Sequence, residues 1–284
     1  MKLARFDAGH GPEIGVVTAN GIISFRRSLT NAPKDLASVI AEWPQWQAQV
    51  IEAAMLREPD FAVGDVRFLA PIPKPGKVLG IGLNYADHVA ESGMDLPAEQ
   101  LWFSKPATAI AGPTDAIPLP RVSEQLDYEA ELVVVIGASC GRYADEDAAR
   151  RAIFGYCVGN DVSVRDWQFK TSQFMLGKSF DGHAPCGPWI VTADEIDATT
   201  LDIVSRVNGE VRQSSNTHNL IFDPVAQVRY LSQVLTLEPG DLLFTGTPGG
   251  VGAGFKPPRW LKDGDLVEVE IAGIGKLTNR VSAD

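Results

Sequence analysis

The chain has 284 residues, 45% of them hydrophobic and 21% charged, so it can bury a substantial core. Its 25 Lys and Arg against 36 Asp and Glu give a net charge of -11, which disfavours nucleic acid and anionic membranes as partners. Charged Lys2 and Arg5 interrupt any secretion signal, and three widely spaced cysteines indicate neither a disulfide framework nor a zinc site. We expect a soluble, cytoplasmic globular protein.

The first 70 residues predict a small α+β domain. Short strands are expected at residues 14–17 and 22–25, and a helix at 35–57. Residues 71–76 read Pro-Ile-Pro-Lys-Pro-Gly, in which fixed ring torsions and missing amide donors disfavour regular structure. We therefore place a domain boundary here, between an accessory domain at 1–70 and a catalytic domain at 71–284.

Beyond this boundary, apolar runs bounded by Gly, Pro, Asn and Asp predict many short strands and few helices. The irregular order favours a β-rich α+β fold over regular βαβ winding. The expected strands are 78–81, 132–136, 153–158, 189–192, 203–207, 242–245 and 266–271, and the expected helices are 87–92, 145–151 and 224–235.

An acidic segment at residues 127–137 carries the strongest chemical signal. If it is one strand, Asp127, Glu129 and Glu131 project to the same side, just before an apolar run. Unpaired charges beside a buried run cost several kcal/mol or more, so a hard divalent cation with oxygen ligands would neutralise them. Asp161, at the end of another apolar run, could complete the site. The alternative is a solvent-facing acidic strand edge.

Basic and dyad-forming residues accompany this acidic segment. Arg165, Gln168, Lys170 and Lys178 form a local basic group that could attract an anionic substrate, although each alone is more typical of a surface residue.

His88 and Glu91 are spaced i and i+3 on the predicted helix at 87–92, which places them on one face. A carboxylate beside an imidazole raises its basicity, as deprotonation of water requires, whereas the alternative is an ordinary exposed pair.

A glycine-rich turn follows the predicted strand at 242–245. Its backbone amides and the Thr247 hydroxyl could bind a carboxylate, with a plain turn as the alternative. It lacks the Gly-Lys-Ser/Thr ending of a nucleotide-binding loop, so we expect no nucleotide here.

Six segments in their order along the chain resemble the fumarylacetoacetate hydrolase superfamily, in particular its bacterial acylpyruvate or 2,4-diketo acid hydrolases. They are residues 82–88 (GLNYADH), 103–106 (FSKP), 127–131 (DYEAE), 159–166 (GNDVSVRD), 177–181 (GKSFD) and 245–252 (TGTPGGVG).

The resemblance implies a catalytic domain of the mixed β-roll type, preceded by the small N-terminal α+β domain, and a homodimer. It assigns a role to each of nine residues. Glu129, Glu131 and Asp161 would ligate Mg²⁺ or Mn²⁺, with Ca²⁺ as a possible structural substitute; His88 and Glu91 would form a base dyad on a mobile lid; Lys178 would stabilise negative charge; and Arg165, Gln168 and Thr247 would contact a small 2-oxo acid.

These inferences predict a hydrolase that cleaves the carbon–carbon bond of a 2,4-dioxo acid, yielding pyruvate and a carboxylic acid. The same site would also serve an oxaloacetate decarboxylase or a keto–enol isomerase. Ureidoglycolate cleavage, or a non-catalytic module stabilised by a structural metal, are further alternatives.

Overall fold

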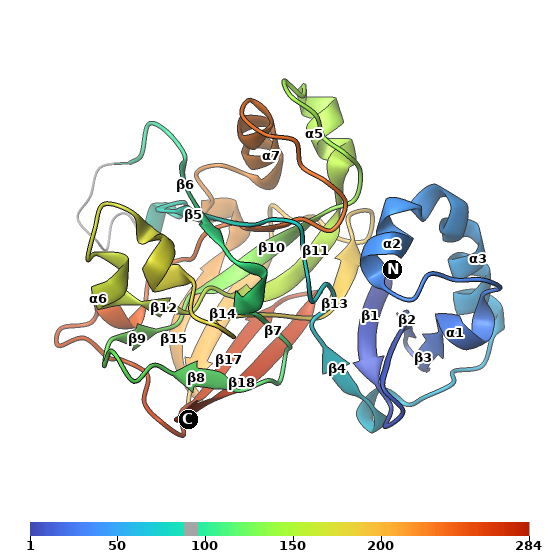
Figure 1. The fold of residues 1–284 in the computed structure, drawn as a ribbon, viewed down its shortest axis with the longest axis horizontal. Coiled ribbons are helices and arrows are strands. Elements are labelled where there is room, and N and C mark those ends of the chain that lie inside the picture. The colour runs from blue at the N-terminus through green and yellow to red at the C-terminus, as the bar shows by residue number, and fades with distance from the viewer. Residues whose placement is uncertain (88–95, 284) are drawn as a thin grey trace.

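The computed structural model describes residues 1–87 and 96–283, and confirms the β-rich α+β class (Figure 1). In this part of the chain the largest sheet has 11 strands. Its order is β3 (Gly21–Ser24), β2 (Pro12–Thr18), β1 (Lys2–Asp7), β13 (Ala184–Thr192), β11 (Ile153–Asn160), β10 (Ala130–Ile136), β16 (Leu242–Phe244), β5 (Val78–Gly82) and β6 (Leu101–Lys105), with β4 (Arg67–Leu69) beside β1 and β7 (Ile110–Ala111) beside β13.

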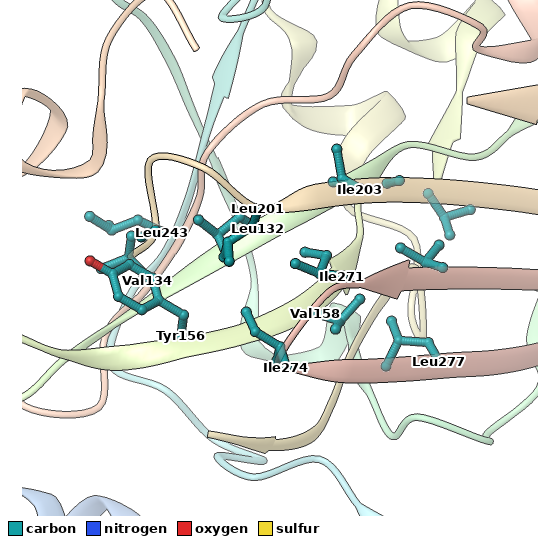
Figure 2. Close-up of a cluster of buried hydrophobic side chains, with 14 of the residues drawn as sticks. Leu132, Val134, Tyr156, Val158, Leu201, Ile203, Leu243, Ile271, Ile274 and Leu277 are labelled. Carbon is teal, nitrogen blue, oxygen red and sulfur yellow. The ribbon is translucent and has the colours of Figure 1, made fainter. Parts of the chain in front are cut away.

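A second sheet lies across one face of the first. Its order is β15 (Glu210–Asn216), β14 (Asp202–Val207), β17 (Leu266–Ile271), β18 (Gly275–Ala283) and β8 (Ile117–Leu119). The main core fills the space between the two sheets, where Leu132 and Val134 pack with Ile203, Ile271 and Leu277 (Figure 2).

Strand β10 is apolar along most of its length because both of its faces are covered. Leu132 and Val134 belong to the core between the two sheets, whereas Val133 and Val135 face the opposite way, into a second core that includes Leu3 and Phe25. A strand buried on both faces reads as a continuous apolar run, which is why this strand was the most readily predicted.

The N-terminal segment adds its strands to the large sheet. Strand β1 pairs antiparallel with β13, with Lys2 opposite Val191 and Leu3 opposite Ile190. The helix expected at 35–57 is divided at Glu42 into α2 (Leu36–Ala41) and α3 (Trp43–Leu56), and Phe25 begins the short α1 (Phe25–Ser28) instead of ending a strand. The domain boundary at residue 70 stays a prediction.

Two of the helices predicted in the catalytic domain are present, and both begin at a capping aspartate. Helix α5 (Glu146–Ala152) follows Asp145, whose side chain accepts a hydrogen bond from Ala148 N, and α7 (Pro224–Ser232) follows Asp223 in the same way. The helix expected at 87–92, with His88 and Glu91, lies largely outside the described residues. In the described ranges, no helix is long and apolar enough to span a bilayer.

Residues 127–137 do not form one strand, so the condition under which Asp127, Glu129 and Glu131 would share one side is not met. The segment is divided into β9 (Leu126–Asp127), which pairs with β12 (Ser163–Val164) in a separate two-stranded sheet, and β10, which begins at Ala130. The Asp127 carboxylate accepts hydrogen bonds from the backbone amides of Tyr128, Gly252 and Ala253, and these contacts hold the chain where the strand is interrupted.

Candidate metal and catalytic centre

Three carboxylates converge where β10 and β11 lie side by side. Glu131 lies on β10, Glu129 directly precedes that strand, and Asp161 directly follows β11, with its amide donating to Glu129 O at 2.9 Å. One oxygen from each of the three lies within 4.8 Å of the others. Glu129 is 5% exposed, Glu131 1% and Asp161 0%, so the triad is not a solvent-facing acidic strand edge. Buried carboxylates require positive charge nearby.

Two lysines and an arginine supply that charge. Lys178 Nζ lies 2.7 Å from Glu129 Oε2 and 2.7 Å from Asp161 Oδ2, and Arg165 Nη1 lies 2.7 Å from Glu129 Oε1. Lys105, at the end of β6, places its ammonium against Asp161 Oδ1 with its side chain fully buried. The predicted Lys178 and Arg165 are thus brought to the triad.

The fourth carboxylate, Asp127, stands outside the triad. Its Oδ2 accepts from Arg165 Nε at 2.8 Å in addition to its backbone amides, so its hydrogen-bonding capacity is taken up by the protein. Arg165 therefore links Asp127 to Glu129 and fixes the chain on both sides of the strand break. With Asp127 included, four carboxylates face three cations, which leaves one net negative charge.

Among the described residues, Glu131 is the member of the triad that contacts no lysine or arginine. Burial raises the pKa of Glu131 well above its usual range, and the neighbouring Asp161 and Glu129 raise it further. For Lys178, burial lowers the pKa, but Asp161 and Glu129 outweigh burial, so its pKa is raised and the ammonium persists. The centre is therefore prepared to accept further positive charge at Glu131.

The glycine-rich turn binds the protein's own carboxylates. Gly246 N donates to Glu131 Oε2 at 2.7 Å, and further along the turn Gly252 N donates to Asp127. Gly246 has a φ of +97°, and a Cβ there would lie 2.8 Å from Asn84 Cβ, so glycine is required for this approach. The predicted carboxylate-binding property is present, directed at side chains of the site itself.

Thr247 from this turn and Gln213 from β15 both hydrogen-bond to the start of β10. The Thr247 hydroxyl donates to Ala130 O at 2.9 Å and accepts from Gln213 Nε2 at 2.8 Å, while Gln213 Oε1 accepts from Ala130 N at 3.0 Å. The substrate contact predicted for Thr247 stays a prediction, because its hydroxyl is engaged here. Gln213 was missed, since a single Gln on a half-polar strand gives no signal of its partner.

Within residues 1–87 and 96–283, the buried donors that lack a protein acceptor include two near the centre, on Arg165 and Tyr85. Arg165 Nη2 has no hydrogen-bond partner, although Arg165 Nη1 also donates to Gln168 Oε1 at 2.8 Å. The hydroxyl of Tyr85 is likewise unpartnered and buried, and its pKa is raised by burial, then by Glu131 and Asp87. Buried donors are normally satisfied, so both groups suit a polar ligand or water at the site.

The remaining predicted residues are less central or not described. Lys170 is exposed and its Nζ lies 3.8 Å from the Trp167 ring centroid, so it does not join the cluster. His88 and Glu91 lie outside the described residues, and their dyad stays a prediction. The sequence analysis does not predict a role for Lys105, although its segment, residues 103–106, is one of the six that resemble the family. The available signal is a lysine at the end of a strand, directly before a proline.

His183 is held in a structural contact with Pro118 and Phe180. It is buried, stacks on Phe180 with ring centroids 5.3 Å apart, and has Nε2 2.8 Å from Pro118 O. Burial lowers its pKa to about 4, so it is neutral near pH 7 and is committed to a structural contact.

The donor set suits a hard divalent cation. Three carboxylates with no sulfur ligand among the described neighbours match the preference of Mg²⁺ and Mn²⁺ for oxygen, and the three residues can leave positions open for water or substrate. The fold and the site together define a buried carboxylate triad on a β-rich scaffold that suits a divalent cation.

The chain belongs to the fumarylacetoacetate hydrolase family. Residues 77–282 match the family model described as fumarylacetoacetate (FAA) hydrolase C-terminal. An oxaloacetate tautomerase, FAHD2A, from Bos taurus is 42% identical over 99% of this chain and 91% of its own length.

Two solved structures are also similar. The fumarylacetoacetate hydrolase of Exiguobacterium antarcticum is 38% identical, with a TM-score of 0.85 over 100% of both chains. A maleylpyruvate hydrolase from Sphingobium sp. SYK-6, in complex with manganese(II) and pyruvate, is 31% identical, with a TM-score of 0.81 over 100% of this chain and 99% of that one.

Proposed function

We propose that this chain is a divalent-metal-dependent enzyme that binds a small 2-oxo acid and hydrolyses the carbon–carbon bond of a 2,4-dioxo acid. The observation that carries the proposal is the buried triad of Glu129, Glu131 and Asp161 with the Lys178 ammonium in direct contact. The maleylpyruvate hydrolase whose structure contains manganese and pyruvate supports both the metal and the 2-oxo acid.

The triad would hold the cation, which would supply Lewis-acid polarisation of the 2-oxo group. Arg165 Nη2, a buried donor without a partner in the part of the chain that the structure describes, can donate to a substrate oxygen. Lys178 presents a charged ammonium inside a buried site, where it can stabilise a developing oxyanion or enolate.

In the proposed reaction, His88, oriented by Glu91, accepts a proton as water adds to C4 of the substrate. The C3–C4 bond then breaks, C4 leaves as the carboxylic acid, and C3 retains the electron pair as an enolate. A proton delivered to C3 gives pyruvate. The His88 and Glu91 roles, the homodimer and the cytoplasmic setting remain predictions.

Keto–enol tautomerisation of oxaloacetate is a second candidate, favoured by the 42% identity to the bovine tautomerase over almost the whole chain. This reaction requires removal of a proton from one substrate atom and its return to another, with no addition of water. The same enolate-stabilising groups would serve it, so the two candidates differ in how the enolate forms: by cleavage of the C3–C4 bond after water addition, or by removal of a proton from carbon.

A substrate panel decides between these candidates. Acylpyruvates, sugar-derived dioxo acids and oxaloacetate are each incubated with Mg²⁺ or Mn²⁺, and products are followed by proton NMR, which separates cleavage, tautomerisation and decarboxylation. We expect pyruvate and a carboxylic acid from at least one 2,4-dioxo acid. If oxaloacetate reacts far faster than every dioxo acid, the hydrolase proposal is wrong.

A variant distinguishes an enzyme from a metal-stabilised binding module. His88→Ala should retain Mn²⁺ affinity, because the triad is intact, while turnover falls by about 100-fold or more. A module without catalytic activity predicts that no substrate in the panel is consumed and that chelation changes only thermal stability.

A further inference from the structure

In each carboxylate of the triad, the protein anchors one oxygen. Glu129 Oε1 is held by Arg165 and Glu131 Oε2 by Gly246 N, both at 2.7 Å, and Asp161 Oδ1 is held by Lys105. The second oxygens of Glu129 and Asp161 both contact the Lys178 ammonium at 2.7 Å. One set of groups (Arg165, Gly246 N and Lys105) therefore anchors one oxygen of each carboxylate, and a different group, Lys178, contacts the second oxygens of Glu129 and Asp161.

This division of oxygens affects which cation the centre prefers. A carboxylate with one oxygen already hydrogen-bonded is disposed to offer only the other oxygen to a metal. Mg²⁺ requires near-octahedral geometry at short distances, with Mn²⁺ favouring the same kind of oxygen site, whereas Ca²⁺ accepts six to eight ligands and readily takes both oxygens of one carboxylate. One-oxygen ligation therefore favours the smaller cations.

Among the three anchors, Lys105 is the side chain whose described ion pair is with one carboxylate alone, Asp161. Its side chain is 0% exposed, as is that of Asp161, and it comes from β6, at the end of the large sheet order, 56 residues earlier in the chain. Arg165 also contacts Asp127, and Gly246 provides a backbone amide, so neither can be changed without disturbing other contacts. Lys105 is the anchor whose effect can be isolated.

We propose that Lys105 is a positioning residue that keeps Asp161 a one-oxygen ligand and thereby makes the centre selective for Mg²⁺ or Mn²⁺ over Ca²⁺. This inference rests on the divalent-metal centre of the proposed function. Removal of the Lys105 ammonium frees Asp161 Oδ1, so that Asp161 can bind a larger cation through both oxygens.

The test is isothermal titration of the full-length protein with Mn²⁺ and with Ca²⁺, comparing the ratio of the two dissociation constants in each variant. Both ions carry two charges, so the loss of one lysine charge affects both affinities alike and largely cancels in the ratio. Lys105→Met should shift the ratio toward Ca²⁺ by about tenfold, the lower end of effects seen for groups that orient metal ligands.

Two variants serve as controls. Lys105→Gln removes the charge but retains an N–H donor for Asp161 Oδ1, so its ratio should stay within about threefold of wild type. Lys77→Met removes a lysine that contacts two carboxylates outside the triad, Glu238 and Asp241, and should leave the ratio unchanged.

The inference is overturned if Lys105→Met leaves the ratio within about threefold of wild type, or if Lys105→Gln shifts it as much as Lys105→Met. A crystal structure of the wild-type protein with Mn²⁺ tests it without any variant: Lys105 should remain on Asp161 Oδ1, and both Asp161 oxygens on the ion would contradict it. Wild-type protein that binds neither ion would instead refute the metal centre itself.

Discussion

Replacement of Lys178 by methionine should destabilise the metal-free protein and increase the stabilisation that a divalent cation provides. The ammonium contacts Glu129 Oε2 and Asp161 Oδ2, both at 2.7 Å, and its side chain is only 3% exposed. Methionine retains most of the apolar length and removes the charge. Both carboxylates then lose a shared buried partner.

The size of the effect follows from what remains. Removal of one partner from a buried ion pair costs about 3–5 kcal/mol, but Glu129 keeps Arg165 and Asp161 keeps Lys105, so we expect the lower end, about 3 kcal/mol. Whatever the protonation state of Glu131, the net charge of the four carboxylates and their cations becomes more negative by one. Mg²⁺ or Mn²⁺ should therefore restore more stability to Lys178→Met than it adds to wild type, where the ammonium must release both oxygens.

Urea unfolding in chelator and in saturating Mn²⁺ measures both quantities. Lys77→Met is the matched control: Lys77 contacts Glu238 and Asp241 at 2.7 and 2.9 Å, its side chain is 26% exposed, and the buried Asp241 keeps hydrogen bonds from the backbone amides of Lys77 and Glu238. We expect this control to lose about 1 kcal/mol or less, with the same metal response as wild type. Equal stabilisation by Mn²⁺ in wild type and Lys178→Met would show that Lys178 and the metal do not compete for these oxygens.

Three further outcomes follow from individual residues. Burial lowers the pKa of His183 from 6.5 to about 4, so the neutral side chain's contribution to stability is complete above pH 6.5 and is lost, by up to about 3 kcal/mol, as the pH falls toward 4. His183→Gln should therefore weaken the dependence of the unfolding free energy on pH between 6.5 and 4, measured by urea unfolding. An unchanged dependence would contradict the assignment. The pKa of Glu131 is raised by burial and then by Asp161 and Glu129, so a cation must displace its proton, and the Mn²⁺ affinity of the wild type measured by titration calorimetry should rise with pH. Glu131→Gln should bind Mn²⁺ weakly, with an affinity that depends less on pH. A wild-type affinity that does not change with pH would count against this reasoning. Gly246→Ala should lower the free energy of unfolding by about 2 kcal/mol or more, because the new Cβ lies 2.8 Å from Asn84 Cβ and the backbone φ is +97°. Gly209→Ala, at a φ of +81° with no atom within 4 Å, should lose only the part due to backbone strain. Equal losses in the two variants would mean that the contact with Asn84 is relieved.

Local signals in the sequence were sufficient for several elements. The apolar run at 132–136 predicted the doubly buried β10, and Asp145 and Asp223 marked the starts of α5 and α7, because capping is decided within three or four residues. The ordered motifs indicated the family, which the match over residues 77–282 confirms. The helix expected at 35–57 failed at Glu42, where the short α2 ends and a second helix begins with Pro44 in its first turn.

The composition of the centre needed the tertiary structure. Strand alternation placed Asp127 with Glu129 and Glu131, but backbone amides from a turn more than 120 residues later bind Asp127 and interrupt the strand. Periodicity states which face a side chain occupies, and it cannot state which distant strand lies opposite.

The sequence by itself thus determined the acidic segment, the family and the need for a compensating positive charge. Only the tertiary structure showed that Lys105 from β6 and Gln213 from β15 complete the surroundings of residues on β10 and after β11. The physical reason is that a buried carboxylate is neutralised by whichever cation the packing of sheets brings within about 3 Å, and that distance is set by strand order and register, neither of which is encoded in the local spacing of residues.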